Sequence, residues 1–206
     1  MHFDNKYVIG LTGGIGSGKT MVLDYLKTEC NCFVIEADKI GHRIMDYKTE
    51  GYDKVVKAFG EDIIKYNEAE PSIDRSILGK IVFSDESKLK LLNSITHPLI
   101  HKEIEEQILN TSYQIVVIEA AILLDSSIKE MCDILWYIYA NMDIRLERLS
   151  QYRNISKEKA LQVMKNQPSD DEFKRKCQVT IDNSYDKENT YEQIKKYLPG
   201  GHLWEK

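Results

Sequence analysis

The feature of this sequence that most limits its fold is a glycine-rich run directly after a short apolar segment. The run satisfies the pattern G-x-x-x-x-G-K-[ST], and the apolar segment before it covers residues 7–12. After the run, Val22, Leu23 and Leu26 recur at helical spacing. A strand, a glycine loop and a helix in this order are typical of a phosphate-binding loop, or P-loop. The loop consists of Gly13, Gly14, Ile15, Gly16, Ser17, Gly18, Lys19 and Thr20.

The residue types of this loop fit the binding of a nucleoside triphosphate. Glycines let successive backbone N–H groups turn toward an anion, because positive φ angles cost them little. A helix that begins near Lys19 presents free N–H groups and its positive end to the phosphates. The Lys19 ammonium suits the β and γ oxygens, and the Thr20 hydroxyl suits Mg²⁺. We therefore expect ATP to bind at residues 13–20, with Thr20 as the metal-binding residue.

The apolar runs of the sequence predict an α/β fold. They are nearly continuous rather than alternating, which is typical of parallel strands covered on both faces. Helical stretches separate them, as in a parallel α/β sheet. We therefore expect a parallel sheet of about five strands flanked by helices. The candidate strands are residues 7–12, 33–35, 115–118, 134–139 and 179–181.

Two long spacings predict additions to this core. Roughly 75 residues separate the second and third strands, so a helical insertion over residues 40–112 is expected there. Residues 145–176 carry nine basic and five acidic side chains, a charge of +4 within a chain of −5. This asymmetry indicates a mobile basic lid over an anionic ligand, although a solvated helical face with chance lysines remains the alternative. We expect one P-loop kinase domain over residues 1–206, with core 7–39, 113–143 and 177–198, insertion 40–112 and lid 144–176.

Local signals predict where several helices begin. They are the capping boxes Ser169–Glu172 and Thr190–Gln193, the N-cap Ser156 of a helix to about Lys165, and Pro98 in the first turn of a helix through about Ile108.

Composition excludes several classes of protein. The net charge of −5 gives no overall basic field for a nucleic acid. No apolar run approaches the roughly 20 residues that span a bilayer, and residues 1–6 lack the apolar segment of a secretory signal. The four cysteines have no partners at zinc-site spacing, so we expect reduced thiols without disulfides or structural metal. We therefore expect a cytoplasmic enzyme that binds no nucleic acid or membrane. For the oligomeric state, which composition does not indicate, our expectation is a monomer.

A P-loop alone leaves the fate of the γ-phosphate open. A GTPase would need the base-reading run N-K-x-D, which this sequence lacks. A motor ATPase usually has paired acids after an apolar strand, whereas here Glu119 is followed by Ala120. The size of the chain favours a kinase that phosphorylates a small-molecule hydroxyl. A kinase for a nucleoside monophosphate or a sugar acid, and a non-catalytic nucleotide-binding regulator, remain as alternatives.

Several further motifs follow the glycine loop in order along the chain. With that loop, the set is Val8–Thr20, Val34–Asp38, Asp74-Arg75-x-x-Leu78 with Val82-Phe83, Leu92-x-x-Ile95-x-His97-Pro98, the residues Arg148, Arg153 and Gln167, and Ile181-Asp182-Asn183. Through these segments the chain resembles the dephospho-CoA kinase family over roughly residues 7 to 198. It departs from the usual family pattern at Glu36, where Asp is common, in the run Glu119–Asp125, and at Cys177-Gln178. The run Glu119–Asp125 resembles instead the kinase portion of bifunctional CoA synthases.

The resemblance implies a reaction and a set of catalytic residues. Members of this family transfer a phosphoryl group from ATP to the ribose 3′-hydroxyl of dephospho-coenzyme A, the last step of coenzyme A synthesis. Asp38 would orient or deprotonate that hydroxyl, although an N-cap role is the alternative for an aspartate at a helix start. Arg148 and Arg153 would neutralise the phosphates, although either could form a surface ion pair, for example with Glu147. With Lys19, the expected catalytic residues are Asp38 and Arg148.

Two further residues are expected to contact the acceptor. Arg75 could meet the phosphates of dephospho-CoA, and its alternative is a helix residue on a solvated face. His97 precedes a proline, where a histidine often forms only a structural hydrogen bond. We expect Asp38, Arg75 and His97 to form the substrate-binding set.

Overall fold

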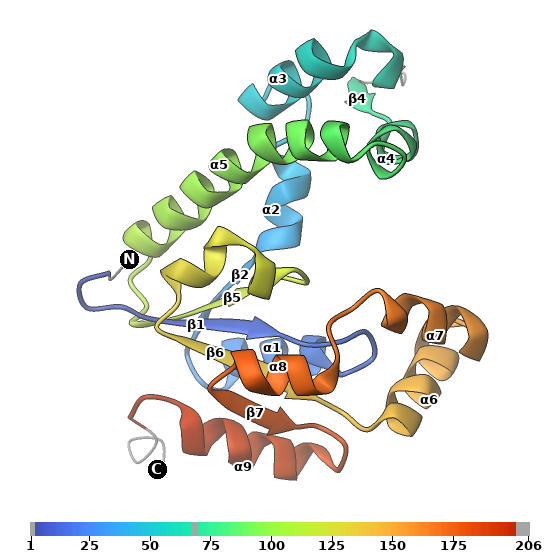
Figure 1. The fold of residues 1–206 in the computed structure, drawn as a ribbon. Coiled ribbons are helices and arrows are strands. Elements are labelled where there is room, and N and C mark those ends of the chain that lie inside the picture. The colour runs from blue at the N-terminus through green and yellow to red at the C-terminus, as the bar shows by residue number, and fades with distance from the viewer. Residues whose placement is uncertain (1–2, 67–69, 201–206) are drawn as a thin grey trace. The chain divides into compact units, whose positions relative to one another are not determined.

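The computed structural model describes residues 3–66 and 70–200, and its central element is a five-stranded sheet in the order β2-β5-β1-β6-β7 (Figure 1). The strand β1 pairs in parallel with both β5 and β6, and β6 pairs in parallel with β7. The expected parallel sheet of five strands is thereby confirmed, with strand bounds within one residue of the prediction. The strands are β1 (Tyr7–Thr12), β2 (Phe33–Glu36), β5 (Ile115–Glu119), β6 (Ile134–Tyr139) and β7 (Val179–Asp182).

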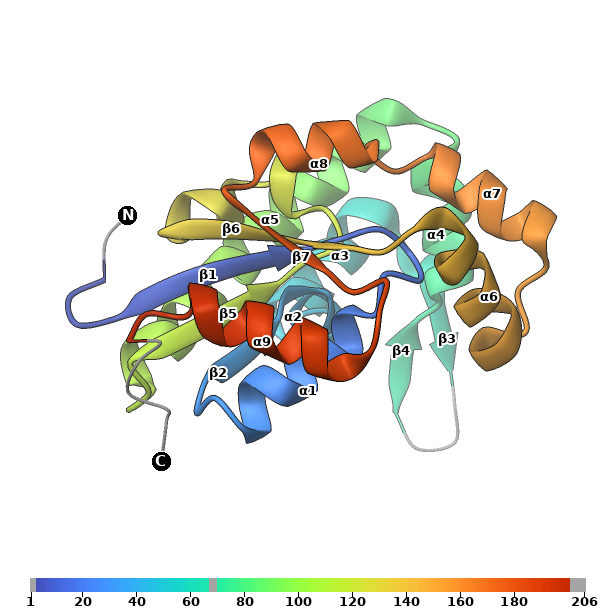
Figure 2. The ribbon, with the colours of Figure 1, turned by 90° about the horizontal axis from the view of Figure 1, so that it is seen from below.

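Helices cover both faces of this sheet. On one face lie α1 (Lys19–Thr28) and α9 (Lys187–Tyr197) (Figure 2). They bury an apolar core against alternate residues of the strands. The rings of Tyr25 and Tyr191 stack 3.7 Å apart between these two helices. On the other face, α8 (Asp170–Lys176) packs Phe173 onto Tyr137 of β6. Burial on both faces explains why the strands are continuous apolar runs.

The chain divides into two compact units, residues 1–35 with 111–206 and residues 36–110. The unit 36–110 is mainly helical, and its core includes Tyr52, Val55, Ile63 and Leu78. A short antiparallel pair, absent from the sequence expectations, lies within it. Its elements are α2 (Ala37–Arg43), α3 (Glu50–Phe59), η1 (Glu61–Ile63), β3 (Ile64–Tyr66), β4 (Pro71–Ile73), α4 (Arg75–Phe83) and α5 (Glu86–Asn110).

The first unit also contains the segment that the sequence marks as basic. It folds as three helices, and the predicted caps begin two of them. Ser156 accepts from Lys159 N–H at the start of α7, and Ser169 accepts from Glu172 N–H at the start of α8. The remaining elements of this unit are η2 (Leu123–Asp125), η3 (Ser127–Met131), α6 (Met142–Arg153) and α7 (Lys157–Lys165).

The predicted helix start at Pro98 is wrong. Pro98 lies inside the continuous helix α5, which begins at Glu86. The carboxylate of Asp85 accepts from the N–H groups of Ser87 and Lys88 and thereby caps that earlier start. Apolar residues upstream of the proline, including Leu92, pack into the core of unit 36–110. This packing keeps the helix continuous despite the hydrogen bond that proline removes.

The predicted capping box Thr190–Gln193 is also wrong. The helix α9 begins at Lys187, three residues before Thr190, and its N-cap is Asp186. Thr190 is buried inside the helix and donates to Asn183 Oδ1 at 3.0 Å. Gln193 exchanges two hydrogen bonds with the backbone of Asp182. Both side chains therefore bind the end of β7 rather than the free N–H groups of a helix.

Two further features concern the helices and the cysteines of the described residues. In the ranges 3–66 and 70–200, no helix is both long and apolar enough to cross a bilayer. All four cysteines are free thiols, and three of them are buried.

Candidate active site

The loop of residues 13–20 follows β1 and leads directly into α1. Gly16 and Gly18 have φ angles of +80° and +88°, values that favour glycine. Gly18 is the N-cap of α1, and among the described residues no side chain caps this helix start. A helix start of this kind, directly after a glycine loop, is suited to bind an anion.

The end of β7 packs directly against this loop through Asn183. Asn183 is buried, and its Nδ2 donates to the carbonyl of Ser17 at 2.7 Å. A Cβ atom at Gly18 would collide with the same amide nitrogen. Thr190 from α9 holds the amide oxygen of Asn183 in place. Gly18 is therefore required both by its backbone angle and by the close approach of Asn183.

Arg148, on α6, is anchored beside the loop. Its two terminal nitrogens donate to the carbonyl of Ser17 at 3.4 Å and to the carbonyl of Asn183 at 2.9 Å. These carbonyl contacts replace the surface ion pair with Glu147 that the sequence left open. The guanidinium is partly exposed, so the helix presents a positive charge at the edge of the loop.

The remaining predicted phosphate-binding residues differ in their surroundings. Lys19 Nζ donates to the carbonyl of Gly13 at 2.8 Å, so its side chain folds back over the loop. Thr20 is exposed in the first turn of α1. Arg153 is also exposed, at the end of α6. The structure thus brings residues 13–20 and Arg148 together.

The three predicted acceptor-binding residues belong to the unit 36–110. Asp38 is exposed in the first turn of α2, and the N-cap of that helix is Glu36. Arg75 is exposed at the start of α4 and donates to the carbonyl of His42 at 3.2 Å. His97 is exposed on α5. Asp38 therefore does not serve as a helix cap, which was the alternative left open by the sequence.

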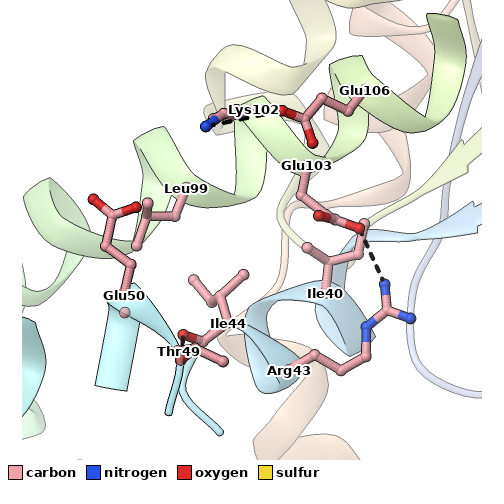
Figure 3. Close-up of a pocket in the computed structure, with 10 residues that line it drawn as sticks. Ile40, Arg43, Ile44, Thr49, Glu50, Leu99, Lys102, Glu103 and Glu106 are labelled. Carbon is pink, nitrogen blue, oxygen red and sulfur yellow. Dashed lines mark hydrogen bonds and ion pairs between the residues drawn. The ribbon is translucent and has the colours of Figure 1, made fainter. Parts of the chain in front are cut away.

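A pocket of about 280 Å³ lies within the same unit, where α2, α3 and α5 meet (Figure 3). Its basic side chains pair with its acidic ones: Arg43 lies 3.7 Å from Glu103, and Lys102 lies 3.8 Å from Glu106. Apolar side chains, among them Ile44, form part of its wall. Because three glutamates outnumber the two basic side chains of its lining, this pocket does not fit a polyphosphate. None of the predicted site residues lines it.

Sequence reasoning missed the structural roles of three residues around the loop. Arg145 entered only the count of basic residues, and it is buried against the loop with its Nε donating to the carbonyl of Ile15 at 2.9 Å. Gln167 accepts from Ile15 N–H at 2.9 Å. Gln167 and Asn183 matched family patterns, but their neighbours in space are more than 150 positions away in sequence. No local pattern could have indicated these contacts.

A parallel sheet whose central strand runs into a glycine loop, with an arginine-bearing helix fixed to that loop, defines the P-loop kinase fold. Solved structures agree with this class. A Thermus thermophilus protein, TT1252, has a TM-score of 0.79 at 22% identity, over 93% of this chain and 95% of its own. A shikimate kinase from Acinetobacter baumannii has a TM-score of 0.50 at 16% identity, over 94% of this chain and 92% of its own. At these identities the likeness shows the fold alone.

Closer similarity identifies the family. Residues 7–189 match the family model described as dephospho-CoA kinase. The chain is 36% identical to a dephospho-CoA kinase of Carboxydothermus hydrogenoformans, over 91% of this chain and 90% of that protein. It is 34% identical to a dephospho-CoA kinase of Lactobacillus johnsonii, over 86% of this chain and 89% of that protein. The dephospho-CoA kinase of Campylobacter jejuni has a TM-score of 0.61 at 26% identity, over 93% and 94%. The chain belongs to the dephospho-CoA kinase family.

Proposed function

We propose that this protein transfers the γ-phosphoryl group of ATP to the ribose 3′-hydroxyl of dephospho-coenzyme A, which gives coenzyme A. The observation that carries this proposal is an intact phosphate loop, with Arg148 anchored to it, in a chain that matches the family over residues 7–189. The protein would act as a cytoplasmic monomer, with residues 36–110 as a substrate-binding insertion and residues 144–176 as a lid.

The ATP phosphates would lie in the loop of residues 13–20. Backbone N–H groups at the start of α1 would bind their oxygens, and Lys19 would place its ammonium on the β and γ groups. The fold of Lys19 over Gly13 supports this role, because it holds the ammonium at the loop. Here the protein's contribution is to fix the phosphates in one orientation.

Mg²⁺ would be held at Thr20. The Thr20 hydroxyl is exposed in the first turn of α1, and a neutral oxygen donor suits this hard cation. When bound together with ATP, the cation would neutralise charge on the β and γ oxygens.

Two arginines of the lid would neutralise the negative charge of the phosphoryl group during its transfer. Charge spreads over the three equatorial oxygens of the transferring phosphoryl group, and planar guanidinium groups bind such oxygens in pairs. Arg148 is already positioned by two carbonyls beside the loop. Arg153, exposed on the same helix, would join it when the lid closes. Closure would also exclude water, which competes with the acceptor for the phosphoryl group.

Asp38 would act on the acceptor hydroxyl as an orienting group and general base. It follows β2 by two residues, and parallel α/β sheets bind ligands beyond the carboxyl ends of their strands. Its carboxylate is exposed and does not cap α2, which leaves it suited to accept the hydroxyl proton. Arg75 and His97 would contact other parts of dephospho-CoA.

An acceptor panel tests this proposal. The protein is incubated with MgATP and, separately, dephospho-CoA, adenylate or shikimate, and ADP release is followed with a coupled assay. Of the three acceptors, we expect only dephospho-CoA to give rapid ADP release. A strong response to adenylate or shikimate without one to dephospho-CoA would contradict the assignment. ATP binding without phosphoryl transfer to any acceptor would favour a nucleotide-binding regulator.

A further inference from the structure

Arg145 is a buried arginine directly beneath the phosphate loop. It lies in the first turn of α6, and its side chain is only 6% exposed. Its Nε donates to the carbonyl of Ile15 at 2.9 Å. A Cβ atom at Gly14 would collide with the guanidinium group, and one at Gly16 would press on the Arg145 backbone. The arginine therefore fills the space that these two glycines leave under the loop.

The opposite edge of the guanidinium is held by an acidic and an aromatic side chain. Its NH1 lies 3.4 Å from Asp170 Oδ1, at the start of α8. The same carboxylate oxygen accepts from the Tyr137 hydroxyl at 2.5 Å. Burial and the neighbouring Asp170 raise the pKa of Tyr137, so its hydroxyl remains protonated and donates. Tyr137 is buried and stacks on Phe173, which fixes this chain of contacts to the sheet.

Ile15 is thus bound on both of its backbone polar groups by side chains of the segment 144–176. Its carbonyl accepts from Arg145, and its N–H donates to Gln167 Oε1 at 2.9 Å. An N–H group bound to Gln167 does not face a phosphate oxygen. The next hydrogen bond along the loop, from Ser17 N–H to the carbonyl of Gly14 at 3.2 Å, closes a turn around Ile15.

We propose that Arg145 is a positioning residue for nucleotide binding: it holds the Ile15 carbonyl, and with it the backbone of the loop 13–20, in the conformation that binds the phosphates. Asp170 and Tyr137 hold Arg145 in turn. The proposal rests on the proposed role of the loop as the ATP site. A loop held in its binding conformation loses less conformational entropy when ATP binds, which lowers the dissociation constant. A guanidinium can bind a carbonyl and a carboxylate at once through separate N–H groups, whereas a single ammonium cannot match this planar geometry.

The alternative is that Arg145 only stabilises the fold, as one member of a partly buried ion pair. The two roles differ in what a substitution changes. A purely structural arginine would change the fraction of folded protein and leave the ATP affinity of the folded molecules unaltered. A positioning arginine changes ATP affinity selectively.

The test compares Arg145→Lys and Arg145→Gln with the wild type by calorimetric titration of MgATP without acceptor, and by the KM values of both substrates. We expect the dissociation constant and KM for ATP to rise about tenfold or more in both variants, and the KM for dephospho-CoA to stay within about twofold. Lys27→Gln, at an exposed lysine in the last turn of α1, is the matched control for the loss of one positive charge and should bind ATP like the wild type. Circular dichroism checks that each variant is folded.

A second variant keeps the proposal testable if Arg145 cannot be replaced without unfolding. Tyr137→Phe retains the ring and its stacking but removes the hydroxyl that holds Asp170, and should raise the ATP dissociation constant about threefold. Wild-type ATP affinity in Arg145→Lys, or in Tyr137→Phe when the Arg145 variants do not fold, would overturn the proposal. Failure of the wild-type protein itself to bind ATP would instead contradict the proposed function.

Discussion

Gly18 combines two constraints at a single residue. Its φ angle of +88° costs an L-residue about 1–2 kcal/mol, and a Cβ atom there would collide with Asn183 Nδ2. We expect Gly18→Ala to displace Asn183 from Ser17 and to weaken MgATP binding about tenfold or more, measured by calorimetric titration.

Gly79→Ala is the matched control for this substitution. Gly79 lies inside α4, and a Cβ atom there would meet only the Phe83 ring at 3.7 Å, an ordinary contact. This change should stabilise the helix by about 0.5–1 kcal/mol and leave ATP affinity unaltered. Equal ATP affinity in the Gly18 and Gly79 variants would show that the loop tolerates a side chain where the contacts forbid one.

Asp38 carries the proposed chemistry of the acceptor. We expect Asp38→Asn to retain ATP binding and to lose about 100-fold or more in kcat, because an amide cannot take the hydroxyl proton. Steady-state kinetics and ATP titration check this split. Asp53→Asn, an exposed carboxylate on α3 of the same unit, should keep wild-type kcat. Near-normal turnover by Asp38→Asn would assign the base to another residue.

Sequence patterns located the phosphate loop residue by residue, because its glycine spacing is a local requirement of the backbone. They did not indicate Arg145 as a loop contact, because its partner Ile15 lies 130 positions away. Likewise, Asn183 matched a family pattern, and only the structure shows that it is buried and that its amide donates to the Ser17 carbonyl. Contacts of this kind depend on how the sheet brings distant segments together.

At the scale of elements, the helix starts show where local sequence rules succeed and where they fail. The N-cap Ser156 and the box Ser169–Glu172 predicted their helix starts correctly, because each serine is exposed and its hydroxyl accepts from a backbone N–H. Thr190 fits the same pattern, but its hydroxyl binds Asn183 inside the molecule. Pro98 failed for a related reason, since packing of α5 overrides the usual position of proline. The pair β3–β4 was missed because each strand has only three residues.

We therefore predict that Asp186 stabilises α9. Its carboxylate accepts from Asn189 N–H at 2.8 Å, and replacing such a cap by alanine costs about 1 kcal/mol. Urea unfolding of Asp186→Ala should show this decrease in the free energy of unfolding. Glu188→Ala removes an acidic side chain from the first turn of the same helix without removing the cap, so its effect should be smaller. Equal effects would indicate a charge contribution rather than capping.

At the scale of the whole molecule, five apolar runs and one loop motif were enough to predict the fold class. They were not enough to predict the order of the strands in the sheet. The central place of β1, between β5 and β6, depends on crossovers that no single segment specifies. Residues 36–110 form a compact unit of their own. Its roles as insertion and substrate site, like the role of the lid, stay predictions.

Burial of the thiols, which is partial for Cys132 and nearly complete for the other three, gives a prediction for the whole chain. It raises the pKa of Cys30 and Cys177 to about 11, and that of Cys32 and Cys132 to about 12, from an ordinary value of 9.0. Since the thiolate is the reactive form, all four should react with an aromatic disulfide reagent about tenfold or more slowly at pH 8 in the folded protein than in urea. The rate should rise with pH above 9. A cysteine that reacts in the folded protein at the free-thiol rate would contradict this burial.

The most direct test of the central claim is the position of the phosphate in the product. The protein is incubated with MgATP and dephospho-CoA, and the product is examined by phosphorus NMR, with Lys19→Ala as the inactive control. We predict a new phosphomonoester on the ribose 3′-oxygen, formed in proportion to ADP and absent with Lys19→Ala. Phosphate on another oxygen, or ADP formed with free phosphate and no phosphorylated acceptor, would contradict the account.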